Sequence, residues 1–151
     1  MNKNEEEITI LIVEDDDDDY LLTKKAFQDS SFTGALHRVK NGDELMTLLR
    51  NSSRQTPLDR KKLLLILDLN MPCKDGREAL KEIKAHSNFR MIPVIVLTTS
   101  NAKADIEMTY ELGASSFISK PTSFEDFAAS IQLLKKYWTE VVQLPCLQDA
   151  L

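Results

Sequence analysis

ITILIVEDD, residues 8–16, is the stretch that decides the fold. Its first six residues are all apolar or β-branched, with no alternation between apolar and charged side chains. A continuous run of this kind is typical of a strand covered on both faces, as in a parallel sheet with helices on either side. Two acidic residues, Glu14 and Asp15, follow the run at once, so the strand is expected to end in carboxylates.

The same pattern recurs along the chain. Four more short apolar runs lie at residues 35–39, 63–67, 92–97 and 115–118, and amphipathic segments lie at 20–28, 43–50, 76–85, 102–112 and 123–138. Apolar residues in these segments recur at helical spacing. Strands that alternate with helices predict an α/β protein of (βα)5 type, a doubly wound parallel sheet of five strands in a three-layer αβα arrangement.

Length and charge restrict the function further. The chain has 151 residues and a formal net charge of −5, which suits a single domain and argues against a nucleic-acid or anionic-membrane surface. We expect an N-terminal tail at 1–7, one domain at 8–138 and a C-terminal extension at 139–151. The acidic run at 5–7 is interpreted as a solvated face.

The two cysteines, Cys73 and Cys146, are far apart and lack zinc-ligand spacing. A redox role for Cys73, close after the third strand, is left open. The chain opens with no signal-peptide pattern and has no apolar stretch of membrane-spanning length, so we expect a soluble cytoplasmic protein.

Polar side chains follow four of the predicted strands. They are Glu14 and Asp15, Asp68, Thr98 and Lys120. Ligands of an open α/β sheet bind beyond the carboxyl ends of its strands, so these groups are expected to converge. Clustered carboxylates favour a hard cation such as Mg²⁺. A carboxylate can also attack phosphorus to give an acyl phosphate, and phosphoryl transfer needs little beyond positioning and charge neutralisation.

Four segments carry a resemblance to a known family: LIVEDD (11–16), ILDLNMPCKDG (66–76), VLTTS (96–100) and GASSFISKP (113–121). In this order and spacing they resemble the receiver domain of bacterial two-component response regulators, over about residues 8–136. The resemblance implies the flavodoxin-like strand order 2-1-3-4-5. It also implies a phosphoprotein of phosphorelay signal transduction, which accepts a phosphoryl group from a histidine kinase and is not an enzyme beyond self-directed phosphotransfer and autodephosphorylation.

The resemblance also implies residue roles. Asp68 is expected to be the phosphoacceptor, modified to 4-aspartylphosphate. Asp15 would bind Mg²⁺ directly, helped by Asp68 and the main-chain carbonyl of Asn70, and Glu14 would hold the metal through water. Lys120 would pair with the phosphoryl oxygens.

A second group of implied roles concerns switching. Thr98 would move its hydroxyl onto the phosphate while Phe117 turns inward. The bond between Lys120 and Pro121 is expected to be cis.

Two further segments resemble a narrower group of regulators and so suggest a partner kinase. DGREALKEIK (75–84) and the tail YWTEVVQLP (137–145) are similar to single-domain regulators of bacterial phytochrome kinases. Apolar residues of the tail suggest a homodimer formed through the helix at 102–112, the strand at 115–118, the helix at 123–138 and the tail itself; they are Tyr137, Val141, Val142 and Leu144.

Three alternatives remain at this stage. A haloacid-dehalogenase-like phosphatase would want a second carboxylate two residues after its nucleophile, where this chain has Asn70. A flavodoxin-like cofactor binder would want a phosphate-binding loop after the first strand, where this chain has five consecutive aspartates. A degenerate receiver, acting only as an interaction module, would not need the acidic set. The sequence does not name the kinase, its signal, the downstream target or the lifetime of the phosphorylated state.

Overall fold

The computed structural model of the chain describes residues 5–51, 62–71 and 74–147. Most of the polar connection before the third strand lies outside these residues, and so does Cys73. Strands and helices alternate as predicted. The strands are β1 (Ile8–Val13), β2 (Ala35–Val39), β3 (Lys62–Leu67), β4 (Val94–Thr98) and β5 (Ser116–Ser119). The helices are α1 (Asp17–Asp29), α2 (Gly42–Asn51), α3 (Gly76–Ala85), α4 (Lys103–Glu111) and α5 (Phe124–Lys136), with single turns η1 (Glu5–Glu7) and η2 (Tyr137–Val141) at the two ends.

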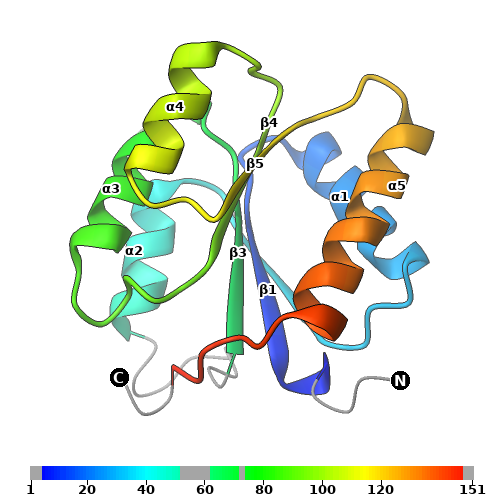
Figure 1. The fold of residues 1–151 in the computed structure, drawn as a ribbon, viewed down its shortest axis with the longest axis horizontal. Coiled ribbons are helices and arrows are strands. Elements are labelled where there is room, and N and C mark those ends of the chain that lie inside the picture. The colour runs from blue at the N-terminus through cyan, green and yellow to red at the C-terminus, as the bar shows by residue number, and fades with distance from the viewer. Residues whose placement is uncertain (1–4, 52–61, 72–73, 148–151) are drawn as a thin grey trace.

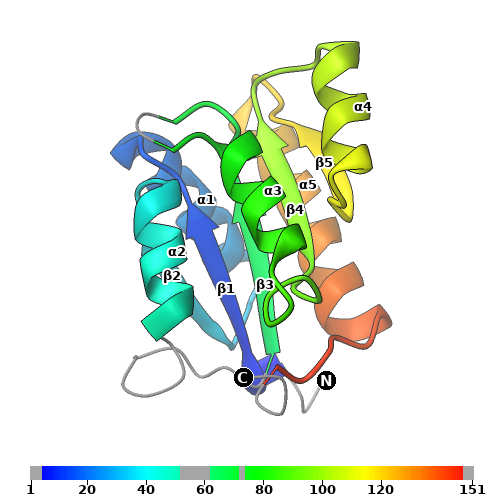
Figure 2. The same ribbon diagram turned by 90° about the vertical axis from the view of Figure 1, so that its left-hand side faces the viewer.

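The five strands form one parallel sheet in the order β2-β1-β3-β4-β5. Helices α1 and α5 cover one face of the sheet, and α2, α3 and α4 cover the other (Figures 1 and 2). This confirms the predicted fold class and strand order. None of the described helices has the length and apolar character needed to cross a membrane.

Each face of the sheet carries its own hydrophobic cluster. Alternate residues of β1 separate between the two, so that Leu11 belongs to the cluster beneath α2 and α3, and Ile10 to the cluster beneath α1 and α5. Every residue of β1 and β4 is buried, whereas the edge strands β2 and β5 are partly exposed. The continuous apolar runs of the sequence therefore mark the inner strands.

Helix α1 starts within the acidic run, ahead of the amphipathic stretch at 20–28, and the reason is a cap. The helix begins at Asp17 rather than at residue 20, because the carboxylate of Asp16 accepts a hydrogen bond from the Asp19 N–H at 2.9 Å. An aspartate in this position satisfies a helix N–H that otherwise lacks a partner. Part of the acidic run is thus the cap and first turn of a helix.

Strand register brings the site residues together. Val13 pairs with Leu67, so the residues that follow them, Glu14 and Asp68, leave the sheet side by side. Two main-chain hydrogen bonds continue the ladders past the strand ends: the Asp68 N–H donates to Val13 O at 3.2 Å, and the Lys120 N–H donates to Thr98 O at 2.7 Å. The carboxyl edge of the sheet is therefore held in register up to the functional side chains.

Two expectations about the chain ends are wrong. Leu144, which was expected to contribute to the homodimer surface, is only 8% exposed and packs in the cluster beneath α1 and α5, so it is not available to a partner. Leu147 is 1% exposed and packs in the opposite cluster. Glu5 is not solvated, because it is 5% exposed and its carboxylate pairs with Lys135. Burial of Leu144 and Leu147 offsets the entropy lost when the tail is ordered. The division at residue 138 stays a prediction.

Candidate functional site

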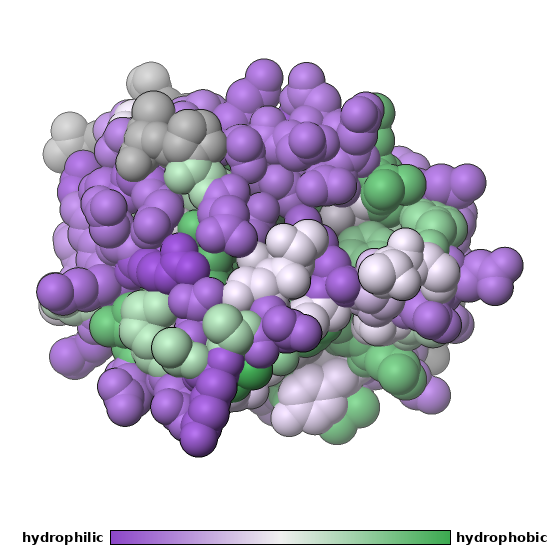
Figure 3. Space-filling model, turned by 90° about the horizontal axis from the view of Figure 1, so that it is seen from above, coloured by the Kyte–Doolittle hydropathy of each residue, from purple (hydrophilic) through white to green (hydrophobic). Residues whose placement is uncertain are grey.

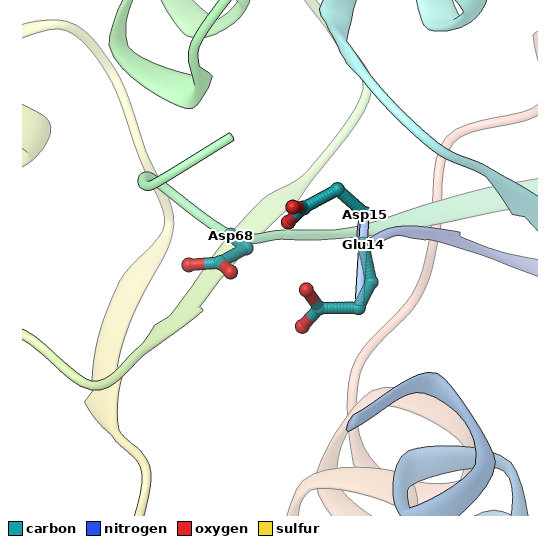
Figure 4. Close-up of side chains that lie close together, drawn as sticks. All are labelled: Glu14, Asp15 and Asp68. Carbon is teal, nitrogen blue, oxygen red and sulfur yellow. The ribbon is translucent and has the colours of Figure 1, made fainter. Parts of the chain in front are cut away.

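Three carboxylates converge at the carboxyl ends of β1 and β3. One oxygen from each of Glu14, Asp15 and Asp68 lies within 4.8 Å of the others. Figure 4 shows the side chains of Glu14 and Asp15 leaving adjacent residues beside Asp68. The surrounding face of the molecule is mostly hydrophilic (Figure 3). Glu14 and Asp68 are nearly buried, whereas Asp15 is exposed. The predicted carboxylate cluster is therefore present, with one member open to solvent.

Among the described residues, one ammonium group faces these carboxylates. Lys120 follows β5, and its Nζ lies 2.8 Å from Glu14 Oε1, 3.7 Å from Asp19 Oδ2 and 4.0 Å from Asp68 Oδ2. The Lys120 side chain is 11% exposed, so water screens these interactions weakly. The carboxylates outnumber the ammonium, and the site carries net negative charge before any ligand binds.

The pKa of Glu14 reflects its burial first and the neighbouring charges second. Burial raises the pKa of its carboxyl from the ordinary 4.5 to about 7; the nearby Asp68 adds to the rise, while the hydrogen bond and charge of Lys120 oppose it. Burial acts to lower the pKa of the Lys120 ammonium. Hydrogen bonding to Glu14 and the charges of Glu14, Asp68 and Asp19 outweigh burial and raise that pKa. The lysine stays charged while part of the acidic cluster resists ionisation.

This donor set fits a hard divalent cation. Oxygen ligands from a few carboxylates, with space for water on the exposed Asp15 side, are typical of Mg²⁺ sites in proteins. A cation would also favour the ionised form of Glu14, whose pKa is raised mainly by burial and further by the charge of Asp68. The Asn70 N–H donates to Asp68 Oδ1 at 3.3 Å, which orients the carboxylate. The expected contact between metal and Asn70 carbonyl stays a prediction.

Thr98 is the last residue of β4 and is fully buried. Its hydroxyl Oγ1 is one of two buried polar side-chain atoms without a hydrogen-bond partner among the described residues. A buried hydroxyl that lacks a partner is destabilising by about 1–3 kcal/mol. The hydroxyl is thus available to an acceptor that the protein itself does not supply.

Phe117 lies in β5 and packs, half-buried, against the cluster beneath α2 and α3. Its N–H donates to the hydroxyl of Tyr110 in α4 at 3.2 Å. Phe117, one of the two residues with an expected switching role, therefore connects the strand that ends at the site to helix α4.

The segment after Asp68 is packed closely onto helix α3. A Cβ on Gly76 would collide with the main-chain carbonyl of Asp68, so only glycine fits there. The Gly76 N–H donates to Leu69 O at 3.0 Å, and Asp75 caps the helix by accepting from the N–H groups of Arg77 and Glu78. The Asp-Gly pair of the sequence therefore fixes the start of α3 against the phosphoacceptor candidate.

One expectation about the site is wrong. No cis peptide bond occurs among the described residues, which include Lys120 and Pro121. The trans form is the ordinary state of an X–Pro bond, and here it is compatible with Lys120 reaching Glu14.

Arg38, which was not predicted as a site residue, lies in β2, and its guanidinium contacts the turn after β1. The only signal was a basic residue near the end of a strand expected beside β1. That signal is too common to single out a residue.

Comparison with known proteins agrees with this geometry. Residues 10–132 match the family described as response regulator receiver domain. The chain is 36% identical over 124 residues to response regulator Rcp1 of Synechocystis sp., which covers 82% of this chain and 84% of Rcp1. It is 35% identical over 121 residues to the probable methanogenesis regulatory protein FilR2 of Methanothrix harundinacea, covering 78% of this chain and 75% of FilR2.

Solved structures give the same result. The Mn²⁺-bound form of Rcp1 superposes with a TM-score of 0.80 and 34% identity, covering 91% of this chain and 99% of that one. The phosphorylated cyanobacterial phytochrome response regulator RcpA superposes with a TM-score of 0.81 and 33% identity, covering 91% and 97%. Neither the phosphatase nor the flavodoxin-like alternative is favoured by these likenesses. Sequence, fold and strand-end chemistry agree, and the chain belongs to the response regulator receiver domain family.

Proposed function

We propose that, in the cytoplasm, Asp68 accepts a phosphoryl group from the phosphohistidine of a histidine kinase. A bond forms between an Asp68 carboxylate oxygen and phosphorus while the phosphorus–nitrogen bond of the donor breaks, and the imidazole leaves. The observation that carries the proposal is the position of the Asp68 carboxylate, beside Glu14 and Asp15 and 4.0 Å from the Lys120 ammonium. Phosphoryl transfer depends mainly on such positioning and charge.

The chain offers a complete set of groups for this reaction. Glu14, Asp15 and Asp68, with the Asn70 carbonyl, would hold Mg²⁺, which when bound supplies positive charge against the phosphoryl oxygens. Lys120 binds a phosphoryl oxygen from the β5 side, because its Nζ already lies 4.0 Å from Asp68 Oδ2. Any turnover is confined to the protein's own aspartyl phosphate.

The test is uptake of phosphate from a small donor. Intact mass after incubation with acetyl phosphate and Mg²⁺ should increase by one phosphoryl group, and Asp68→Asn should abolish the increase. Asp29→Asn, an exposed change at the far end of α1, is the matched control and should label like the parent protein. Undiminished labelling of Asp68→Asn would refute the assignment, and a receiver used only for interaction would not label at all.

Thr98 and Phe117 are proposed to transmit the modification. The partnerless Thr98 hydroxyl would donate to the phosphoryl group, and Phe117 would turn inward and disturb its contact with Tyr110 on α4. Thr98→Ala should still accept phosphate, yet NMR shifts along α4 and β5 on adding beryllofluoride should shrink. Full-size shifts in Thr98→Ala would contradict the coupling.

A phytochrome-type kinase is the proposed phosphodonor in the cell. The likeness to RcpA supports it, because that protein is a phytochrome response regulator. FilR2, which is almost as similar in sequence, is named as a probable methanogenesis regulatory protein, so sequence likeness alone does not single out a phytochrome kinase. Phosphotransfer from a purified, phosphorylated bacterial phytochrome kinase to this chain is the deciding assay. Transfer no faster than from an unrelated histidine kinase would exclude a specific pairing.

A homodimer through α4, β5, α5 and the tail is proposed as the form that docks. The supporting observation is an exposed apolar stripe at four-residue spacing: Leu133 is 70% exposed, Tyr137 49% and Val141 64%. Exposed apolar patches commonly mark interfaces, and symmetric dimers are the commonest closed assembly.

Sedimentation tests the dimer without shortening the chain. Leu133→Glu and Val141→Glu should each favour the monomer, whereas Leu21→Glu, at a position of α1 that is 57% exposed, should not. Truncation is unsuitable because it would remove the buried Leu144 and Leu147. Monomeric behaviour of the parent protein with and without beryllofluoride would exclude the dimer.

A further inference from the structure

Arg38 reaches from the edge strand β2 over the acidic turn that joins β1 to α1. Its Nε donates to the main-chain carbonyl of Glu14 at 3.0 Å, and its Nη1 pairs with Asp17 Oδ1 at 2.7 Å. The guanidinium also lies over the ring of Tyr20, with its Cζ 4.6 Å from the ring centroid. The side chain is 15% exposed. Three separate contacts therefore fix this guanidinium against the turn.

These contacts complete the immobilisation of Glu14. Its N–H donates to Val39 O at 3.1 Å and its carbonyl accepts from Arg38, so β2 holds the residue through both main-chain groups. Its carboxylate is held separately, by Lys120 at Oε1 and by the Asp16 N–H at Oε2. The peptide that leads into Asp15 is thus fixed from the β2 side.

Asp15 has no such support of its own. Its side chain is exposed, and among the described residues no hydrogen bond or ion pair to its carboxylate is present. Its direction toward Asp68 therefore depends on the main chain of the turn. Arg38 sets that main chain by binding the carbonyl immediately before Asp15.

We propose that Arg38 is a positioning residue for the metal site, which holds the Glu14–Asp15 peptide so that the Asp15 carboxylate faces Asp68. The inference rests on the proposed metal-dependent phosphoryl transfer. The direction of the change in Mg²⁺ affinity on replacing Arg38 distinguishes positioning from a simple charge effect. A positive charge near a dication site disfavours the dication by simple electrostatics, so removing the charge alone would strengthen Mg²⁺ binding. Loss of positioning would weaken it.

The Nη2 of Arg38 is buried and has no hydrogen-bond partner among the described residues, which is a destabilising feature. The observed orientation of the guanidinium therefore does not satisfy all of its own N–H groups. The orientation is instead set by the contacts to Glu14, Asp17 and Tyr20, which is consistent with a role in holding the turn.

The experiment is a Mg²⁺ titration of Arg38→Met and Arg38→Lys, followed by backbone amide NMR shifts at the site. Lysine keeps the charge but lacks the planar group that binds two oxygens at once. We expect both variants to weaken Mg²⁺ binding at least fivefold. Asp17→Asn, which leaves the Nε contact to Glu14 intact, should change affinity at most twofold. Arg50→Met, which removes an exposed ion pair with Glu82, is the matched control.

The outcomes separate cleanly. Unchanged or tighter Mg²⁺ binding in Arg38→Met, or full affinity in Arg38→Lys, would overturn the positioning role. If Arg38→Met fails to fold, Arg38→Lys alone decides by the same criterion. Failure of the metal site itself would be seen differently, as absence of Mg²⁺ shifts in the parent protein or equal affinity of the parent and Asp15→Asn.

Discussion

A largely buried lysine meets a buried glutamate at both the amino and the carboxyl ends of the strands, and the two pairs have different surroundings. At the amino edge, Lys135 Nζ lies 3.4 Å from Glu5 Oε1, which also accepts from the Thr33 N–H at 3.1 Å. At the carboxyl edge, Lys120 Nζ lies 2.8 Å from Glu14 Oε1 but is shared with further carboxylates. The charges of the first pair therefore cancel, whereas at the second site the carboxylates outnumber the lysine.

The difference separates a structural pair from a functional one. A balanced buried pair needs nothing more than its partner and its hydrogen bonds, and it connects η1 to α5 in the folded chain. An unbalanced cluster keeps negative charge in a poorly solvated place, which destabilises the metal-free fold. Excess charge of one sign at the carboxyl ends of parallel strands therefore indicates a ligand-binding site.

The largest effect should come from exchanging the two lysines for methionine. Lys120→Met should slow labelling by acetyl phosphate about 100-fold, because one fixed cation is lost from the phosphoryl site. Lys135→Met should label at the parent rate, since it lies at the other edge. Rates from intact mass against time check both. Equal slowing by the two substitutions would remove the distinction between the edges.

The second effect concerns stability, and here Lys135→Met is the substitution with the large effect. Lys135→Met should lower the free energy of unfolding by about 3 kcal/mol, because it leaves the Glu5 carboxylate buried without its cation. Adding Glu5→Gln should restore at least half of the loss. Urea denaturation of the single and double variants gives both values. If the double variant is no more stable than Lys135→Met, the pair is not the cause.

The third effect is on metal binding. Asp15→Asn should raise the Kd for Mg²⁺ about tenfold, or about 1.4 kcal/mol, because one of the few protein ligands is lost. Glu7→Gln, which removes an acidic group that lies 3.9 Å from Lys62 at the amino edge, should leave the Kd unchanged. The Mg²⁺ dependence of Tm measures both. A raised Kd in Glu7→Gln would mean that overall charge, and not the cluster, binds the metal.

The fourth effect is a pH dependence of the metal-free protein. The pKa of Glu14 in the fold, about 7, exceeds the ordinary 4.5, so between these values the folded chain holds more protons than the unfolded one. This group therefore stabilises the fold fully below pH 4.5, and its contribution is lost as pH rises to about 7. In EDTA, Tm should fall by a few degrees over that interval.

Glu14→Gln should flatten this fall, and so should excess Mg²⁺. The pKa values of Asp17, Glu82 and Asp105 are lowered by their partners, so those groups lose stability at more acidic pH and do not mask the effect. An identical fall in Glu14→Gln would assign it to another group.

Most of the carboxyl-edge site could be predicted because a parallel sheet brings the ends of all its strands to one edge. Predicting Asp68, Thr98 and Lys120 required only the positions of the strand ends, which the apolar runs indicate. Arg38 could not be found in this way, because its contact with Glu14 depends on the pairing of β2 beside β1 and on the shape of a turn.

The amino edge was predicted less well for the same physical reason. The Glu5 and Lys135 side chains meet only after the whole sheet has formed, and each alone resembles an ordinary surface charge. Leu147 packs beneath α2 and α3 although it follows α5 on the opposite face. A tail that crosses between two layers leaves no periodic signal in its sequence.

The partnerless hydroxyl of Thr98 limits how sharply the protein can switch. A hydrogen bond to a charged group contributes about 1.5–3 kcal/mol, so a new bond from Thr98 to a phosphoryl oxygen changes the ratio of two conformations about 10- to 150-fold. Moving a population from 1:99 to 99:1 takes about 10⁴-fold. On the proposed mechanism, Thr98 alone gives a graded response in which both conformations remain populated, and Lys120 and the metal ion must contribute the rest.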